Sequence, residues 1–332
     1  MSRVAVVFTG GTIASLPDPV TGAAMPRLDG AAILARVPGL DAVAEVESID
    51  WGMVPASHLS FAQLLDLARI LERALARPDV DGAVVVQGTD SLEETSFAFD
   101  LLVSSDKPVI VVGAMRNAGD PAWDGPRNLR DAVRVAASAE ARDAGTLVVM
   151  AGAILPADDA VKLHTDRETA FGAPNVGPLG HVSDAGVRFD RPRGARRRLT
   201  PMPLTAAEPV HLITATVGMD GALVRAARTT RPAGFVVAAT GAGNTHADLL
   251  AACREAMADG LTVALTTRCV SGLAAPAYGF PGGGATWVEA GALLCGTLNG
   301  PKARVAVALG LGAGLDRTAM TALLAGPSTG RD

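Results

Sequence analysis

Two short polar turns hold the residues of this chain whose types and spacing could do chemistry. One reads Thr9-Gly10-Gly11-Thr12 and the other reads Gln87-Gly88-Thr89-Asp90. Each comes directly after a compact apolar run of strand type, at residues 4–8 and 83–86. We therefore expect the hydroxyls and the carboxylate of these turns at the carboxyl ends of parallel strands, where open α/β sheets bind their ligands.

Thr12 is the candidate nucleophile, because a threonine in a glycine-rich strand-to-helix turn has backbone N–H groups close to its own hydroxyl. Acyl transfer needs such donors to stabilise the oxyanion that forms on the attacked carbonyl. The plainer alternative is that Thr12 caps the helix that follows. A nucleotide-binding turn is a weaker alternative, since neither GxGxxG nor GxxxxGKS/T is present in the turn.

Both turns resemble the two marks of the bacterial-type L-asparaginase family, a TGGTIA nucleophile turn and a second turn usually written HGTDT. The first reads TGGTIA here, and the second reads QGTDS, with Gln87 for the usual histidine and Ser91 for the usual threonine. Both replacements keep the capacity to hydrogen-bond. The resemblance continues in order along nearly the whole chain, at residues 108–116, 124–126, 128–129, 162, 177–180, 241–244, 267–269, 296–299 and 302–304.

The resemblance implies a nucleophilic Thr12 and a supporting triad. Thr89, Lys162 and Asp90 would form the family's hydroxyl–amine–carboxylate triad, and Asp90 would also bind the α-ammonium of the substrate. A lysine amine can act as a base when burial favours its neutral form, and a neighbouring carboxylate can orient it. Taken alone Lys162 would be a surface cation, but residues 161–165 resemble the family's lysine segment.

The same resemblance implies a substrate pocket. Ala114 and Met115 match the segment whose backbone carbonyl receives the side-chain amide of the substrate. The family commonly has a serine that binds the carboxylate of the substrate. An alignment anchored on the helix at 60–76 places Ala56 at the position of that serine, with Ser57 beside it. An alignment anchored on Ile49-Asp50 would place Trp51 there instead, and we prefer Ser57. The predicted substrate-binding residues are Gly11, Ser57, Gly88, Thr89, Asp90 and Ala114.

The segment at 15–27 corresponds to the family's lid, which often carries a tyrosine that activates the nucleophile. Here the segment has none, and the only tyrosine of the chain is Tyr278. Its prolines and glycine indicate turns without a helical or strand period, and we expect a lid that is mobile when empty. Water, a polar lid group or the Thr89–Lys162 pair could activate Thr12. We favour Tyr278 of a neighbouring chain.

A second departure lies near Tyr278, where the family often supplies an acidic residue from the neighbouring subunit. No Glu or Asp occurs between Gly272 and Trp287. Asn244 and His246 fall in a glycine-rich turn that, in the family, reaches the active site across a subunit interface. The inter-subunit candidates are therefore Asn244, His246 and Tyr278.

Strands alternate with helices along the chain, which predicts an α/β protein with a doubly wound, mostly parallel sheet. Residues 60–76 predict an amphipathic helix with a capping box from Ser60 to Gln63, and Ser91 with Glu94 predicts a second capping box. A further helix is expected to open at residues 124–126. We predict a larger N-terminal catalytic domain at 1–190, a linker at 191–210 and a smaller C-terminal α/β domain at 211–332.

The composition excludes several functions. A net charge of −5 argues against a nucleic-acid partner, and the basic cluster at residues 191–198 is interpreted as a solvated linker face. No apolar run reaches membrane-spanning length, and the first strand begins at Val4, so we expect a cytoplasmic protein. Three cysteines without a CxxC pair predict buried thiols, and five histidines without metal spacing predict no metal and no cofactor.

The sequence therefore predicts an amidohydrolase that cleaves the side-chain amide of L-asparagine, giving L-aspartate and ammonia through a threonine acyl-enzyme. A glutaminase-asparaginase, or another related amide hydrolase, is the alternative within the enzyme class, because one methylene discriminates weakly. A catalytically poor amino-acid-binding protein on the same fold is the alternative outside it. The related tRNA-amidotransferase subunit is disfavoured, since no extra domain precedes Val4 and no basic surface is evident. The family assembles as homotetramers of close dimers, which implies a homo-oligomer here, a dimer or a tetramer.

Overall fold

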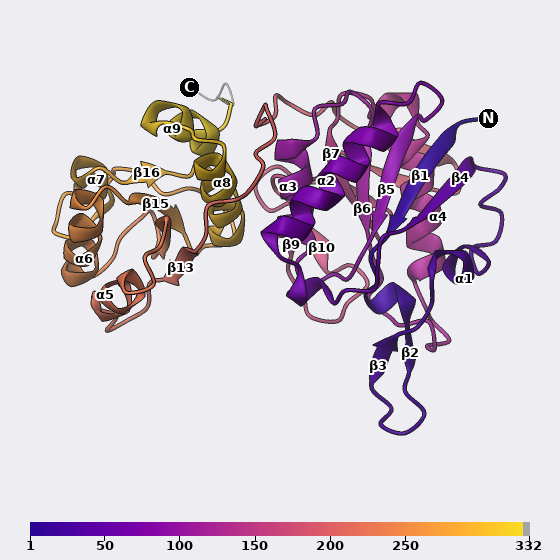
Figure 1. Cartoon of the computed structure of the whole chain (residues 1–332), viewed down its shortest axis with the longest axis horizontal. Helices are drawn as coiled ribbons and strands as arrows, with labels where there is room; N and C mark the ends of the chain where they lie inside the picture. Colours follow the sequence, from indigo (N-terminus) through magenta and orange to yellow (C-terminus); the bar gives the residue numbers. More distant parts are fainter. Residues whose placement is uncertain (328–332) are drawn as a thin grey trace. The chain divides into compact units, whose positions relative to one another are not determined.

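The structure is a computed structural model that describes residues 1–327. The chain forms two compact units that divide between Gly194 and Ala195. Each unit has its own sheet, mostly parallel in the first unit and parallel in the second, with helices packed on both faces (Figure 1). The predicted fold class, a larger doubly wound domain followed by a smaller α/β domain, is confirmed. The predicted linker at 191–210 stays a prediction.

The first unit is built on an eight-stranded sheet in the order β12-β11-β8-β7-β6-β5-β1-β4. β1, β4, β5, β6 and β7 run parallel, and β8, β11 and β12 add antiparallel strands at one edge. The parallel strands are Arg3–Phe8, Glu45–Asp50, Gly82–Val86, Val109–Val112 and Thr146–Met150. The edge strands are Ala153–Pro156, Gly180–Ser183 and Gly186–Phe189. Because β5 lies between β1 and β6, the turns that leave these three strands share one edge of the sheet.

The helices of the first unit cover both faces of its sheet. α2 and α3 pack against each other on one face, and α4 lies on the other (Figure 1). The helices are α1, Gly30–Leu34; α2, Phe61–Leu75; α3, Leu92–Leu102; and α4, Gly125–Ala136. The capping box that starts α2 is confirmed, since Ser60 and Gln63 exchange their hydrogen bonds. The second capping box is wrong: Ser91 precedes α3, but its Oγ donates to the carbonyl of Ala56 at 2.7 Å.

Short elements join these strands and helices. They are the 3₁₀ helices η1, Thr12–Ala14; η2, Ala56–His58; and η3, Ala139–Ala141, with the strands β2, Ser15–Pro17; β3, Ala24–Pro26; β9, Val161–Lys162; and β10, Phe171–Gly172. The expectation that residues 15–27 lack a strand period is wrong, because β2 and β3 pair as an antiparallel hairpin. Asp18 stabilises its turn by accepting from the backbone N–H groups of Val20 and Thr21. These hydrogen bonds lower the pKa of the Asp18 carboxyl.

The second unit has a four-stranded parallel sheet in the order β13-β14-β15-β16. The strands are Val210–Thr214, Gly234–Ala239, Thr262–Thr267 and Leu293–Leu294. The helices are α5, Ala222–Arg228; α6, Ala247–Ala258; α7, Gly284–Ala290; α8, Gly300–Gly312; and α9, Arg317–Ala325. Phe235 on β14, Leu249 on α6 and Trp287 on α7 are fully buried in one apolar cluster. α8 packs along β13, β14 and β15.

Two arginines of the basic cluster are buried, so its interpretation as a solvated face is wrong for them. Arg193 places one guanidinium nitrogen 2.6 Å from Asp100 Oδ2 and 3.0 Å from Asp158 Oδ1, inside the first unit. These two carboxylates raise the pKa of Arg193 against the opposing effect of burial. Arg197 donates to the last carbonyls of α9, those of Leu323, Leu324 and Ala325, and so completes the carboxyl end of that helix.

The thiols divide into two classes. Cys253 and Cys295 are buried, and burial raises the pKa of each to about 12. Cys269 is exposed, so the prediction of a buried thiol is wrong there. In residues 1–327 no helix combines the length and the apolar character needed to cross a membrane. The same part of the chain contains no group of three His, Cys, Asp or Glu residues that could hold a metal ion.

Candidate active site

The turn that follows β1 is shaped by two glycines. Gly10 and Gly11 have φ angles of +99° and +90°, which L-amino acids with a side chain rarely adopt. Gly11 is the N-cap residue of η1 and Thr12 is its first residue, so the alternative in which Thr12 caps the helix is wrong. Ser15 Oγ donates to the carbonyl of Gly11 at 2.9 Å, and this buried hydrogen bond stabilises the turn.

The turns after β1 and β5 lie backbone to backbone. A Cβ added to Gly11 would lie only 2.2 Å from the backbone nitrogen of Gly88. Just before the turns, the backbone N–H of Thr9 donates to the carbonyl of Val86 at 3.0 Å and extends the parallel ladder. The Thr12 turn and the Thr89 turn therefore form one continuous surface.

Lys162 joins this surface from β9, a strand distant in sequence. Its Nζ donates to Thr89 Oγ1 at 2.9 Å and to Asp90 Oδ1 at 2.8 Å. Its backbone N–H donates to Glu93 Oε2 at 2.9 Å, which attaches β9 to the first turn of α3. The Lys162 amine thus contacts both the Thr89 hydroxyl and the Asp90 carboxylate, and the catalytic role of the three groups stays a prediction. The Lys162 side chain is 19% exposed and that of Asp90 71%, so Asp90 still presents its carboxylate to solvent.

The turn after β6 brings Ala114 to the same edge of the sheet. A Cβ on Gly113 would lie 2.7 Å from the carbonyl oxygen of Gln87 and 2.9 Å from Thr89 Cγ2. Ala114 is buried next to this contact. Three neighbouring parallel strands, β1, β5 and β6, thus place the turns that bear Thr12, Thr89 and Ala114 next to one another.

Residues 56 and 57 approach the second turn from η2. The Cβ of Ala56 would lie 3.0 Å from a Cβ on Gly88, whereas Ser57 is exposed on the same short helix. Gln87 is fully buried, and its Nε2 donates to the carbonyl of Gly88 at 3.2 Å. Ala56 therefore contacts the turn itself, and the role of Ser57 stays a prediction.

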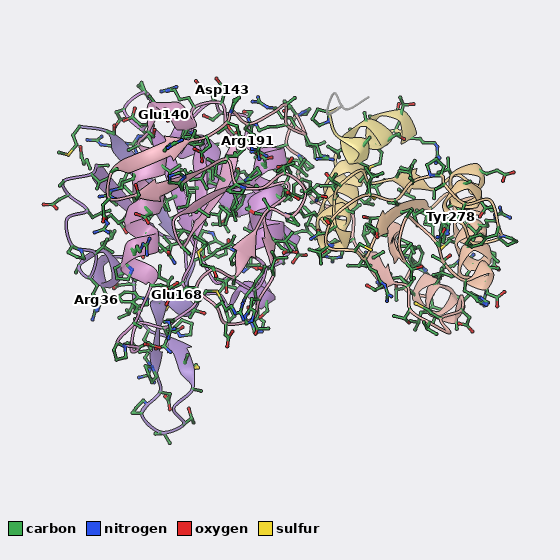
Figure 2. The ribbon with its side chains drawn as sticks, turned by 180° about the vertical axis from the view of Figure 1, so that it is seen from behind. Arg36, Glu140, Asp143, Glu168, Arg191 and Tyr278 are labelled. Atoms are coloured by element: carbon green, nitrogen blue, oxygen red, sulfur yellow. The ribbon has the colours of Figure 1, made fainter. Side chains whose placement is uncertain are left out.

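The three inter-subunit candidates belong to the second unit. Asn244 forms a backbone bridge with Thr240, and His246 caps α6 by accepting from the backbone N–H of Asp248 at 3.2 Å. Tyr278, labelled in Figure 2, is 49% exposed, with its ring centroid 5.9 Å from that of Phe280. Their participation in a shared site stays a prediction.

The turns at the carboxyl ends of β1, β5 and β6 carry the motifs that resemble a known family, and the comparisons with known proteins identify that family. Residues 3–194 match the family model described as "Asparaginase, N-terminal", and residues 209–324 match that of the "Glutaminase/Asparaginase C-terminal domain". The chain belongs to the asparaginase family. It is therefore a member of a family of hydrolases, as predicted.

Proteins named as asparaginases or probable asparaginases resemble the chain over nearly its whole length. A probable L-asparaginase of Deinococcus radiodurans is 37% identical over 96% of this chain and 95% of that protein. The crystal structure of a probable cytoplasmic L-asparaginase from Campylobacter jejuni superposes with a TM-score of 0.88 at 29% identity. It covers 98% of this chain and 99% of that one. A subunit of the glutamyl-tRNA(Gln) amidotransferase of Haloquadratum walsbyi is 32% identical over 82% of this chain and 63% of that protein.

Two glutamates that no sequence motif indicated, Glu93 and Glu168, support the candidate site. Glu93 binds the backbone of Lys162, and Glu168 accepts from Arg116 Nε at 2.9 Å, which ties the β9–β10 hairpin to the loop after β6. Figure 2 shows Glu168 at the same end of the first unit as the β2–β3 hairpin, opposite Glu140 and Asp143. No local motif marks these pairs, since each joins segments that are far apart in sequence.

Proposed function

We propose that this asparaginase-family enzyme hydrolyses L-asparagine to L-aspartate and ammonia through an acyl-enzyme on Thr12. One observation carries the proposal: Lys162 Nζ contacts both Thr89 and Asp90 on a turn whose backbone touches the Thr12 turn. A nucleophile and a separate hydroxyl–amine pair are the two functions that a two-step acyl transfer needs.

In the first step the Thr12 hydroxyl attacks the carbon of the side-chain amide. A C–O bond forms, the C–N bond breaks, and the hydroxyl proton passes to the departing nitrogen, which leaves as ammonia. In the second step Thr89, with the Lys162 amine as base, removes a proton from water, which attacks the β-acyl ester. The ester C–O bond breaks, the proton returns to Thr12 and L-aspartate is released.

The charged groups support the binding of an α-amino acid. The exposed carboxylate of Asp90 can pair with the α-ammonium, and the carbonyl of Ala114 can accept from the amide nitrogen. Ser57 is the proposed partner of the α-carboxylate. Asn244, His246 and Tyr278 would complete the site from a neighbouring chain of a dimer or tetramer, and no cofactor or metal takes part in the proposed steps.

We also propose a preference for L-asparagine and a cytoplasmic location. Relatives named L-asparaginase support asparagine over glutamine, although one methylene in a pocket discriminates by only about 1–3 kcal/mol. A glutaminase-asparaginase is therefore the nearest alternative, and a catalytically poor amino-acid-binding protein is the second. The similarity to the probable cytoplasmic L-asparaginase of Campylobacter jejuni supports a cytoplasmic location.

Ammonia release from L-asparagine, L-glutamine and D-asparagine tests the function. We expect turnover of L-asparagine, a loss of about a thousandfold or more in Thr12→Ala, and partial activity in Thr12→Ser. Thr321→Ala is the matched control, because Thr321 donates to a carbonyl of its own helix, α9. Near-normal ammonia release from Thr12→Ala would contradict the mechanism. Binding of asparagine without turnover by the unsubstituted protein would favour the binding-protein alternative.

A further inference from the structure

The loop at residues 113–116, called here the amide loop, is held by two side chains from the start of α4. The carboxylate of Asp124 accepts from the backbone N–H of Met115 at 3.0 Å and from that of Arg116 at 2.9 Å. Asn128 lies one helical turn further on and contacts both Asp124 and the loop. Two consecutive N–H groups of the amide loop are thus bound to one carboxylate.

These contacts determine where the carbonyl of Ala114 points. The carbonyl of Ala114 and the N–H of Met115 belong to the same peptide unit, which is planar and trans. In a trans unit the C=O and N–H point in opposite directions. Because Asp124 binds the N–H, the carbonyl of Ala114 must point away from Asp124.

Asn128 holds both Asp124 and the peptide before Ala114. Its Nδ2 donates to the carbonyl of Gly113 at 3.1 Å and to Asp124 Oδ2 at 2.9 Å. Its Oδ1 accepts from the backbone N–H of Ala151 at 3.1 Å, which attaches the group to the end of β7. Asn128 is 1% exposed, so its amide has little freedom to move. Three successive peptide units of the amide loop are therefore oriented from one helix.

The Asp124 side chain binds the amide loop and does not cap its own helix, α4. Asp124 is the N-cap residue of α4, yet its side chain makes no capping hydrogen bond. Aspartate at an N-cap usually accepts from an N–H of the first helical turn, and such a cap contributes about 0.5–2 kcal/mol. The carboxylate binds the amide loop instead, which indicates that the orientation of that loop is the requirement the residue meets.

We propose that Asp124 and Asn128 are positioning residues that aim the Ala114 carbonyl at the amide nitrogen of the substrate. The inference rests on the proposed function of Ala114 as the acceptor of the substrate amide. A carbonyl held in this direction recognises an N–H, so the pair favours the carboxamide over an oxygen ester of the same acyl group. Neither side chain touches the substrate.

The test compares L-asparagine with the β-methyl ester of L-aspartate, which yields the same acyl-enzyme but has no amide N–H. We expect Asn128→Ala and Asp124→Asn to lower kcat/KM for asparagine by about tenfold or more. Both should change kcat/KM for the ester by less than about threefold. Asp124→Asn preserves volume and replaces one acceptor oxygen by a donor, so it remains informative if Asn128→Ala fails to fold.

Asp100→Asn is the matched control. Asp100 is also buried, and its Oδ1 accepts from the backbone N–H of Thr146 at 3.0 Å, at the amino end of β7. It should lower the urea midpoint of unfolding without changing the ratio of amide to ester hydrolysis. Equal losses on both substrates, or a ratio no lower than that of Asp100→Asn, would overturn the positioning role. Absence of asparagine hydrolysis by the unsubstituted enzyme would instead contradict the proposed function.

Discussion

Gly11 and Gly88 are in direct backbone contact, and a Cβ on Gly11 would lie 2.2 Å from the nitrogen and 2.3 Å from the Cα of Gly88. Backbone atoms at such a distance cannot rotate out of the way as a flexible side chain can. The contact therefore sets the separation between the turn that bears Thr12 and the turn that bears Thr89. Gly11 is therefore required by the backbone geometry of the site.

Gly11→Ala is expected to reduce turnover by about a hundredfold or more, because it forces the two turns apart. Gly39→Ala is the matched control: Gly39 also has a positive φ, +70°, but no atom lies within 4 Å of its added Cβ. Both variants bear a backbone cost of about 1–3 kcal/mol, seen in urea unfolding. Turnover in Gly11→Ala equal to that in Gly39→Ala would mean that the contact does not position the nucleophile.

Lys162→Met should lower kcat by about a hundredfold or more, since it keeps the apolar stem and removes the amine that contacts Thr89. The decisive measurement is ammonia release at saturating asparagine. Lys107→Met is the control, because Lys107 Nζ donates to the carbonyl of Leu75 at 2.9 Å and should affect only stability. A loss of less than about tenfold, roughly 1.4 kcal/mol, would reduce Lys162 to a structural cation.

Tyr278→Phe is expected to lower turnover by about tenfold or more while leaving the melting temperature unchanged. The substitution removes only the hydroxyl proposed to activate Thr12 from a neighbouring chain, and the half-exposed ring keeps its contact with Phe280. Mixing Tyr278→Phe with Thr12→Ala chains checks the sharing of sites, because some mixed interfaces would regain both groups. Unchanged turnover in Tyr278→Phe would rule out this activation.

Arg193→Met should destabilise the first unit by about 3–5 kcal/mol, because it removes the guanidinium that neutralises the buried carboxylate of Asp100. Urea unfolding measures the loss. Arg142→Met removes the exposed ion pair with Asp106 and should cost less than about 1 kcal/mol. Neither change should alter kcat, since both arginines act at the amino ends of the strands. A loss in Arg193→Met as small as that in Arg142→Met would show that the buried pair contributes little.

Much of the fold follows from local patterns. The capping box at Ser60 and Gln63 and the apolar period behind it predicted α2 to within one residue at each end. The alternation of strands and helices predicted the sheet class, because parallel strands need helical crossovers. The β2–β3 hairpin was not predicted because Pro17 and Pro26 lie in its strands, where proline is unusual away from sheet edges. The capping box predicted at Ser91 was wrong for another reason. The Ser91 side chain matches a capping pattern, but it donates to the carbonyl of Ala56, which is distant in sequence.

The sequence by itself determined the chemistry of the two turns, since Gly10 and Gly11 permit backbone angles that few other residues adopt and Thr12 and Thr89 supply the hydroxyls. The family resemblance grouped Lys162 with Thr89, but only the tertiary structure shows the contact between these residues, 73 positions apart, and that of Asp124 with the amide loop. Turn chemistry depends on neighbours in the chain and can be read locally. Contacts between segments depend on how β1, β5, β6 and β9 pack, which no short pattern encodes.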